Sequence, residues 1–443
     1  MDPKEVKDAL ERAATEAVEL ARRLGADQAE AAVSHDEGLS VTVRMGELES
    51  VERQRDRGLA VTVYKDRRKG TASSNDFSRR GIEDVVTKAL SIARFTAPDE
   101  YAGLADAELM AREIPDLDLY FPSGLAVDAA TEIALRAETA AREFDTRIEN
   151  SEGATVNTGE GVRVYANSHG FVGGYPSSSH SISCSVIAKS GESLERDYWY
   201  TTARAFTDLD SPEDVGRECA KRTVRRLGAR QPKTKVVPVI YPPELARGLF
   251  GHFLGAIRGT SQYRKSTFLL NALGERIFPD FVDMEEDPFI PRGLGSAPFD
   301  AEGVATRRRM LVERGVLRGY LLSSYSARRL GMQTTGNAGG VHNLIVKPNA
   351  GPLEELIASC DEAFVVGELL GQGVNPVTGD YSRGAAGFWV ERGKIAYPVN
   401  EVTVAGNLRD MFRSILAIGS DVDTRGSIRT GSVLVDKLTV AGK

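Results

Sequence analysis

The sequence predicts an α+β protein in two parts, an α/β N-terminal half and a mostly antiparallel β C-terminal half. Before residue 231, amphipathic helix patterns are mixed with strand-like runs, as in a layer of helices on a sheet. After residue 231, strand-like runs separated by Gly-rich turns dominate, and the chain holds 44 glycines. With 443 residues, 41% of them hydrophobic, the chain can build a large core without a metal or disulfide.

Residues 1–95 are predicted to form an N-terminal α+β domain. Apolar residues recur at helical spacing over residues 3–25, and Gly25 is a natural end for that helix. Four strands are then expected, over residues 29–34, 39–45, 58–64 and 68–74. Ser78 is a suitable cap for a second helix with a single apolar stripe.

Residues 96–230 are predicted to continue the N-terminal half as a central α/β segment. Its first part, residues 96–122, is rich in Pro, Asp and Ala without a period and is interpreted as a long connection. A helix is expected over residues 126–144. A second helix should begin at Ser211, because Pro follows at the first helical position, and end before Gly228.

Strand-like segments fill residues 148–202 between these two helices. Two parts of this region are rich in residues that favour turns. Gly159-Glu160-Gly161 is therefore interpreted as a hairpin turn, and Pro176–Ser179 as a loop between strands.

Residues 231–443 are predicted to form the C-terminal β-rich domain, with the boundary at Gln231-Pro232-Lys233. A strand over residues 236–241 and a helix over about 243–257 open it. The remaining strands are expected over residues 306–313, 317–322, 363–370, 385–391, 394–403 and 431–440.

Charge and cysteine content narrow the possible functions. The net charge of −7 and the shortness of the basic runs argue against nucleic acid as a partner. The three cysteines, Cys184, Cys219 and Cys360, are far apart and are expected as reduced, buried thiols in the cytoplasm. No signal peptide or apolar run long enough for a membrane span is expected.

The common cofactor and nucleophile motifs do not fit this chain. Gly371–Pro376 begins like a dinucleotide loop but places Pro where the third glycine belongs. No nucleophile elbow is present. Ser323–Ser326 is polar, and a helix start or loop is the favoured interpretation.

His252 lies on an apolar helix that follows a strand, where a zinc peptidase would carry two histidines and a glutamate. The preceding positions hold Arg247 and Gly248 instead. Arg cannot ligate zinc and Gly accepts no proton. From the residues alone, His252 is most simply a core histidine, and residues 247–252 are expected to form an ordinary helix.

Residues 247–252 and five further runs resemble one family over nearly the whole chain. The runs are Gln262–Leu269, Gln333–Ala338, Gly367–Gly384, Tyr397–Thr403 and Leu434–Gly442. They are similar to the TldD/PmbA family, and specifically to its PmbA branch, also called TldE. The resemblance implies the two-domain fold of that family.

In this family, TldD-like chains hold zinc through His-Glu-x-x-x-His and a late Cys. The resemblance aligns Arg247 with the first His, Gly248 with the Glu and His252 with the second His. The late Cys falls near Thr424–Gly431, where this chain has none, and Cys360 lies too early to replace it. The resemblance therefore implies no catalytic residue and no cofactor in this chain, with zinc in a TldD-like partner.

The resemblance implies a metal-free subunit of a heteromeric peptidase that cleaves peptides and unfolded chains, including precursors of peptide antibiotics. One alternative is a self-associating peptide-binding or scaffold protein, which leaves a homodimer of the isolated chain open. Another is a free-standing hydrolase that uses Tyr263, His252 or Ser324, although no base–nucleophile pairing is visible.

A substrate or partner surface is predicted on the Gly-rich segments Gly336–Val341 and Leu370–Gly384, for which ordinary tight turns are the alternative. The candidate residues of this surface are Tyr263, Arg264, Asn337, Tyr381 and Arg383.

Overall fold

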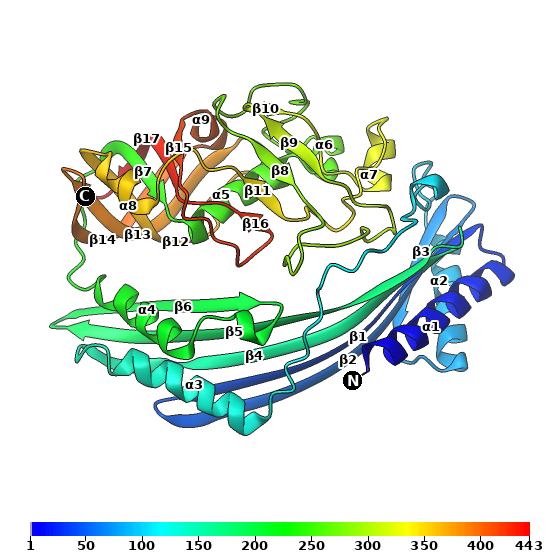
Figure 1. The fold of residues 1–443 in the computed structure, drawn as a ribbon. Coiled ribbons are helices and arrows are strands. Elements are labelled where there is room, and N and C mark those ends of the chain that lie inside the picture. Colours follow the sequence, from blue (N-terminus) through cyan, green and yellow to red (C-terminus); the bar gives the residue numbers. More distant parts are fainter. Residues whose placement is uncertain (1) are drawn as a thin grey trace.

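The computed structural model describes residues 2–443, and its N-terminal half is built on one long, curved antiparallel sheet (Figure 1). The strand order is β3-β2-β1-β4-β5-β6. The strands are β1 Gln28–Arg44, β2 Glu47–Lys65, β3 Arg68–Ser74, β4 Ile148–Asn167, β5 Val172–Ser190 and β6 Ser193–Ala203.

Four helices cover the convex face of this sheet (Figure 1). They are α1 Pro3–Arg23, α2 Arg79–Phe95, α3 Val127–Arg142 and α4 Pro212–Val224. Each places an apolar stripe on the sheet, α1 and α2 at one end and α3 and α4 at the other. The cap at Ser78 is confirmed, because its side chain accepts a hydrogen bond from the amide of Gly81.

The strands of this sheet are longer than the sequence indicates. The two strands expected over 29–34 and 39–45 are one strand, β1. The polar residues 47–57, which were not assigned to a strand, belong to β2 and are exposed on both faces. Because neither face is buried there, the residues show no alternation from which a strand could be predicted.

Two predicted breaks in the central segment are wrong. Gly159–Gly161 is not a hairpin turn but lies in the middle of β4, paired with β1 and β5. Pro176–Ser179 is not a loop but part of β5. Pro176 is tolerated because β6 pairs with β5 only from His180 onward, so this stretch of β5 is a sheet edge.

The C-terminal half contains a ring of strands in the order β14-β13-β12-β7-β17, which closes where β14 pairs with β17. All of its pairings are antiparallel except the one between β12 and β7. The strands are β7 Lys235–Tyr241, β12 Glu362–Leu370, β13 Asp380–Glu391, β14 Lys394–Asn407 and β17 Val433–Ala441, with β15 Ile415–Ile418 beside β17.

A smaller five-stranded sheet packs beside this ring, in the order β10-β9-β8-β11-β16. Its short strands are β8 Met284–Glu286, β9 Arg309–Glu313, β10 Val316–Leu317, β11 Leu344–Val346 and β16 Ile428–Arg429. The main helix, α5 Pro243–Ala256, lies in the core between the sheets. The shorter helices are η1 Ala107–Leu109, η2 Phe206–Asp208, α6 Gly259–Tyr263, α7 Ser324–Arg329, α8 Leu353–Ala358 and α9 Leu408–Arg413.

The two halves face each other across the concave side of the large sheet (Figure 1). The architecture confirms the predicted α+β fold class. Cys184, Cys219 and Cys360 are free and buried, as expected. Within residues 2–443, no helix combines the length and apolar character that a membrane crossing requires.

Candidate functional site

Helix α5 presents the three residues that the family resemblance aligns with a zinc motif. Its buried face, which includes Phe250 and Phe253, packs into the core of the C-terminal half. The opposite face carries Arg247, Gly248 and His252. The helix is continuous through these positions, which confirms the expected ordinary helix. Gly248 is exposed, and no neighbouring atom lies within 4 Å of the place a Cβ would take.

The Arg247 guanidinium joins α5 to two other segments. It donates to the backbone carbonyl of Arg425 (2.9 Å) and to the hydroxyl of Tyr200 on β6 (2.7 Å). It also lies 3.6 Å from the Asp423 carboxylate. Burial would raise the pKa of Asp423, but hydrogen bonds from Arg425 and the charge of Arg247 hold it below its ordinary value. This cation therefore bridges the two halves of the molecule.

The side chains at these positions do not fit a zinc ion. Arg247 has no lone pair to offer and is already engaged with Asp423 and Tyr200. Gly248 has no side chain, and among residues 2–443 no three His, Cys, Asp or Glu side chains gather closely enough to hold a metal ion. The region where the resemblance places the late Cys is instead the segment that Arg247 contacts.

His252 lies in a small polar cluster with residues of β7 and β13. Its ring is edge-on to Tyr381, with centroids 6.2 Å apart, and burial together with the charge of Arg383 lowers its pKa. The fully buried hydroxyl of Tyr241 and the Arg383 Nε have no hydrogen-bond partner among the described residues. The structure thus brings together His252, Tyr381 and Arg383, which the sequence singled out separately.

The predicted substrate or partner surface needs a correction for two of its five residues. Tyr381 is buried under His252, and only 5% of Asn337 is exposed. Asn337 accepts hydrogen bonds from Arg309 (2.7 Å) and Thr335 (2.7 Å) and donates to Glu286 (2.6 Å), so it holds the core of the small sheet together. Its amide can be buried because each of its polar atoms has hydrogen-bond partners.

The other three residues of the predicted surface are less buried, with Tyr263 and Arg264 adjacent at the end of α6 and Arg383 on β13. Arg264 is exposed beside α6. Tyr263 packs edge-on against Tyr325 and under the guanidinium of Arg329. Arg383 is half-buried, and its Nη2 donates to the carbonyl of Leu369 (3.3 Å).

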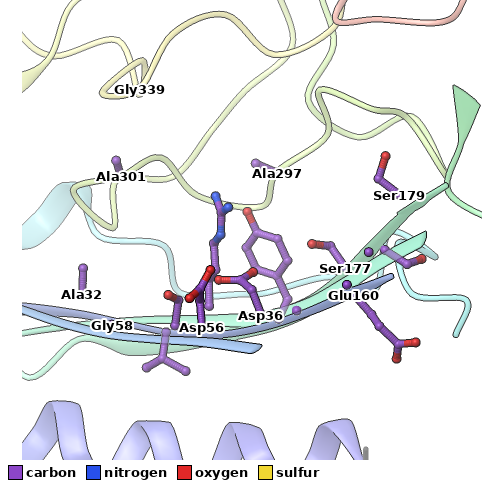
Figure 2. A pocket seen from close by; sticks show the side chains of 18 of the residues that line it. Ala32, Asp36, Asp56, Gly58, Glu160, Ser177, Ser179, Ala297, Ala301 and Gly339 are labelled. Atoms are coloured by element: carbon purple, nitrogen blue, oxygen red, sulfur yellow. The ribbon is translucent and has the colours of Figure 1, made fainter. Parts of the chain in front are cut away.

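A cavity of 1310 Å³ lies between the concave face of the large sheet and loops of the C-terminal half. Its floor is formed by β1, β2, β4 and β5, and its roof by residues 294–301 and 338–342. The roof includes the end of the predicted Gly-rich segment Gly336–Val341. Figure 2 shows Ala297, Ala301 and Gly339 above the strands of the floor.

Part of the floor of this cavity is made of small side chains because of the strand register. Opposite one another across three strands lie Gly38, Gly159 and Ser179 in one row, and Asp36, Gly161 and Ser177 in the next. A Cβ on Gly161 would lie 2.2 Å from Asp36 Oδ1, so glycine is required there while Asp36 keeps its position. The residues that suggested a turn and a loop are therefore the cavity floor.

Two aspartates stand side by side on this floor. Asp36 and Asp56 are direct partners across β1 and β2, and Figure 2 shows both side chains directed into the cavity. Neither forms an ion pair within the described residues, since the nearby Arg55 pairs with Glu37 on the other face (2.9 Å). Like charges directly opposite each other destabilise a sheet. The two unpaired carboxylates therefore do not stabilise the sheet, and they are available to bind a ligand.

The roof of the cavity is anchored by Asp300. Its carboxylate accepts hydrogen bonds from the amides of Glu302 (2.9 Å), Val304 (3.0 Å) and Ala338 (2.9 Å), which ties two roof loops together. Burial and the charge of Glu302 raise the pKa of Asp300 to about 7 despite these donors. The protonation state of this residue therefore changes near neutral pH.

The three residues of the alternative hydrolase do not form one site. The hydroxyl of Ser324 is buried and donates to Glu302 (2.5 Å), while Tyr263 contacts Tyr325 and His252 contacts Tyr381. The prediction that Ser323–Ser326 is a helix start or loop is confirmed, because α7 begins at Ser324 and Ser323 is its capping residue. The arrangement therefore pairs none of Tyr263, His252 and Ser324 with another of the three as nucleophile and base.

Sequence reasoning missed Asp36, Asp56 and the small residues of the floor. The available signal was the presence of strand-like residues on both sides of Gly159–Gly161 and Pro176–Ser179. A row of small residues within a strand-like run is also typical of a strand that lines a cavity with one face.

Comparison with protein families identifies the chain as a member of a metallopeptidase family. Three family models match: the PmbA/TldA metallopeptidase domain 1 over residues 29–93, the central domain over 121–227 and the C-terminal domain over 234–442. The chain belongs to this family, PmbA/TldD.

Individual relatives agree with this assignment. Over 98% of this chain and 96% of the relative, it is 51% identical to the metalloprotease PmbA of Escherichia coli O157:H7. A crystal structure of a proposed DNA gyrase modulator from Bacteroides thetaiotaomicron matches with a TM-score of 0.93 and 28% identity over 98% of each chain. TldE from Thermococcus kodakarensis shares the fold, with a TM-score of 0.85 and 21% identity over 96% of this chain and 99% of that one.

Proposed function

We propose that this chain is the zinc-free, TldE-type subunit of a cytoplasmic two-chain metallopeptidase. In this proposal a TldD-like partner holds the zinc and cleaves the peptide, and the present chain binds the substrate. The observation that carries the proposal is Arg247, a permanent cation held between Asp423 and Tyr200 at the position where the zinc chain needs a histidine. A guanidinium engaged in this way supports a structural role for the α5 region.

The interdomain cavity is the proposed place of substrate binding. At 1310 Å³ it exceeds the range of about 300–1,000 Å³ that is common for small-molecule pockets, so it can hold several residues of an extended peptide. Its floor offers serine hydroxyls and glycine backbone rather than deep apolar pockets, which suits a chain recognised with little sequence preference. Precursors of peptide antibiotics and other unfolded segments are the substrates proposed.

The free carboxylates of Asp36 and Asp56 add one preference. Because they carry negative charge without a partner, we expect peptides with Lys or Arg to bind more tightly than acidic ones. In the scaffold alternative the chain also binds peptides. That alternative predicts that adding a TldD-like partner produces no peptidase activity.

Two measurements on purified proteins test the proposal. The chain alone should retain no stoichiometric zinc and cleave no fluorogenic peptide, whereas mixing with a TldD-like chain should produce cleavage. His252→Ala should change that activity only modestly. A tightly held zinc in the isolated chain, or peptidase activity without the partner, would contradict the proposal.

A further inference from the structure

The polar cluster around His252 contains hydrogen-bond donors that lack acceptors. The Arg383 Nε and the Tyr241 hydroxyl are both buried, and neither has a hydrogen-bond partner among residues 2–443. The remaining guanidinium nitrogens of Arg383 make one long contact there, from Nη2 to the carbonyl of Leu369 (3.3 Å). A buried donor without an acceptor costs stability, so two such donors in one place indicate a site where a ligand accepts hydrogen bonds.

The charge of Arg383 is not balanced by a carboxylate. Arg383 forms no ion pair with a described residue, whereas the partly buried Arg247 and Arg309 each pair with an acidic side chain. Burial and the charge of Arg383 lower the pKa of His252, so at neutral pH its ring is neutral and donates from one nitrogen. The cluster therefore carries one positive charge and several donors, which suits an anion.

The face of α5 that carries His252 is open. At helical spacing, Gly248, Gly251 and Gly255 lie on this same face, and no neighbouring atom comes within 4 Å of the place that a Cβ would take on any of them. Glycine destabilises a helix interior relative to alanine, and no packing contact requires it here. The bare face leaves room for the backbone of a bound peptide to lie close to α5 beside His252.

We propose that the glycine face of α5 binds a peptide whose carboxylate accepts hydrogen bonds from Arg383 and His252. A guanidinium suits this ligand, because its N–H groups match the two oxygens of a carboxylate. Neither Arg383 nor His252 lines the interdomain cavity, so this is a second site. The cavity offers free carboxylates and this cluster a free cation, so the two sites select opposite charges. The inference rests on the proposed role of the chain in peptide binding.

Two acetylated tetra-alanine peptides, one with a free C-terminal carboxylate and one with a C-terminal amide, test the site by isothermal titration calorimetry on the full chain. Wild type should bind the free acid at least roughly tenfold more tightly than the amide. Arg383→Met should remove this difference and leave the affinity for the amide unchanged. An amidated peptide with one Asp distinguishes the source of the carboxylate: affinity like that of the free acid shows that a side chain also binds, and affinity like that of the amide assigns the site to the C-terminus.

A second variant, Gly248→Ala with Gly251→Ala, leaves Arg383 in place. Its melting temperature should rise, because alanine favours the helix, while its affinity for the free acid should fall severalfold, because the new methyl groups occupy the open face. Arg80→Met on α2 is the matched control for the loss of an arginine and should keep the preference for the free acid. Equal affinities of wild type for acid and amide, or an unchanged preference in Arg383→Met, overturn the inference. Cleavage that depends on a partner would still support the proposed function in that case.

Discussion

The α5 region and the interdomain cavity both contain clustered charges, and they use them in opposite ways. At α5, Arg247 and Asp423 are bonded to each other and to neighbouring segments. In the cavity, Asp36 and Asp56 face each other without a partner. Paired charges hold a fold together, whereas unpaired like charges cost stability and persist where a ligand uses them. This comparison indicates a structural role for the Arg247 contacts in the α5 region and a binding role for the interdomain cavity.

The largest expected effect concerns Asp300 in the cavity roof. Its pKa is about 7 in the folded chain against an ordinary 3.8, so the folded state holds this proton more tightly. Raising the pH from about 4 to about 7 should therefore lower the free energy of unfolding, by roughly 4 kcal/mol from this group. Urea unfolding across this range should show a flatter profile for Asp300→Asn. Equal slopes in the two proteins would remove Asp300 as the cause.

Arg247→Met should destabilise the chain by about 2–3 kcal/mol. The change leaves the buried Asp423 with Arg425 alone and removes the link to Tyr200, although partial exposure of Arg247 moderates the cost. Urea unfolding measures it. Arg80→Met on the surface of α2 is the control and should stay within about 0.5 kcal/mol of wild type. If both variants unfold alike, the contacts of Arg247 with Asp423 and Tyr200 do not stabilise the fold.

Asp36→Asn with Asp56→Asn should weaken binding of a Lys-rich peptide about tenfold, or about 1.4 kcal/mol. The same variant should be slightly more stable than wild type, because the repulsion across β1 and β2 disappears. Fluorescence anisotropy with a labelled peptide measures the affinity. Glu83→Gln with Asp84→Asn removes the same charge from α2 and should change neither quantity. Unchanged affinity in the cavity variant would show that the free carboxylates do not contact peptide.

The smallest effect is expected from Gly161→Ala. The new Cβ displaces the end of the flexible Asp36 side chain, so stability should change by less than about 0.5 kcal/mol while peptide affinity falls severalfold. Gly159→Ala is a close control, because its nearest neighbour would be the carbonyl of Ser179 at 3.5 Å, an ordinary contact. Equal affinities for the two variants would argue that the position of Asp36 is unimportant.

The sequence predicts well those elements that bury one face. Helices α1 to α4 and the helix through residues 247–252 follow from apolar spacing, because each packs one stripe on a sheet. The floor of the cavity could not be predicted in this way. Gly159 and Ser177 resemble turn residues, and their place in mid-strand depends on the loops opposite them, which are more than a hundred residues away along the chain.

The same distinction holds for the candidate site: some of its features follow from the local sequence, and others only from the fold. Local spacing identified Arg247, Gly248 and His252 as a motif that lacks its ligands. Only the fold shows that Arg247 contacts residues 423–425 and that Tyr241 completes a cluster with His252. A buried side chain such as Asn337 was assigned to a surface because sequence alone does not report what covers a Gly-rich loop.

The closed ring of the C-terminal half has a consequence for synthesis on the ribosome. Its first strand, β7, lies between β12 and β17, so the ring is complete only when residues 433–441 have been made. The large sheet needs nothing beyond residue 203 for its strands and can form much earlier. A translation pause late in the chain would therefore leave β7 and β14 as bare edges beside a finished N-terminal half. The nascent protein is most exposed to misassembly during its last few codons.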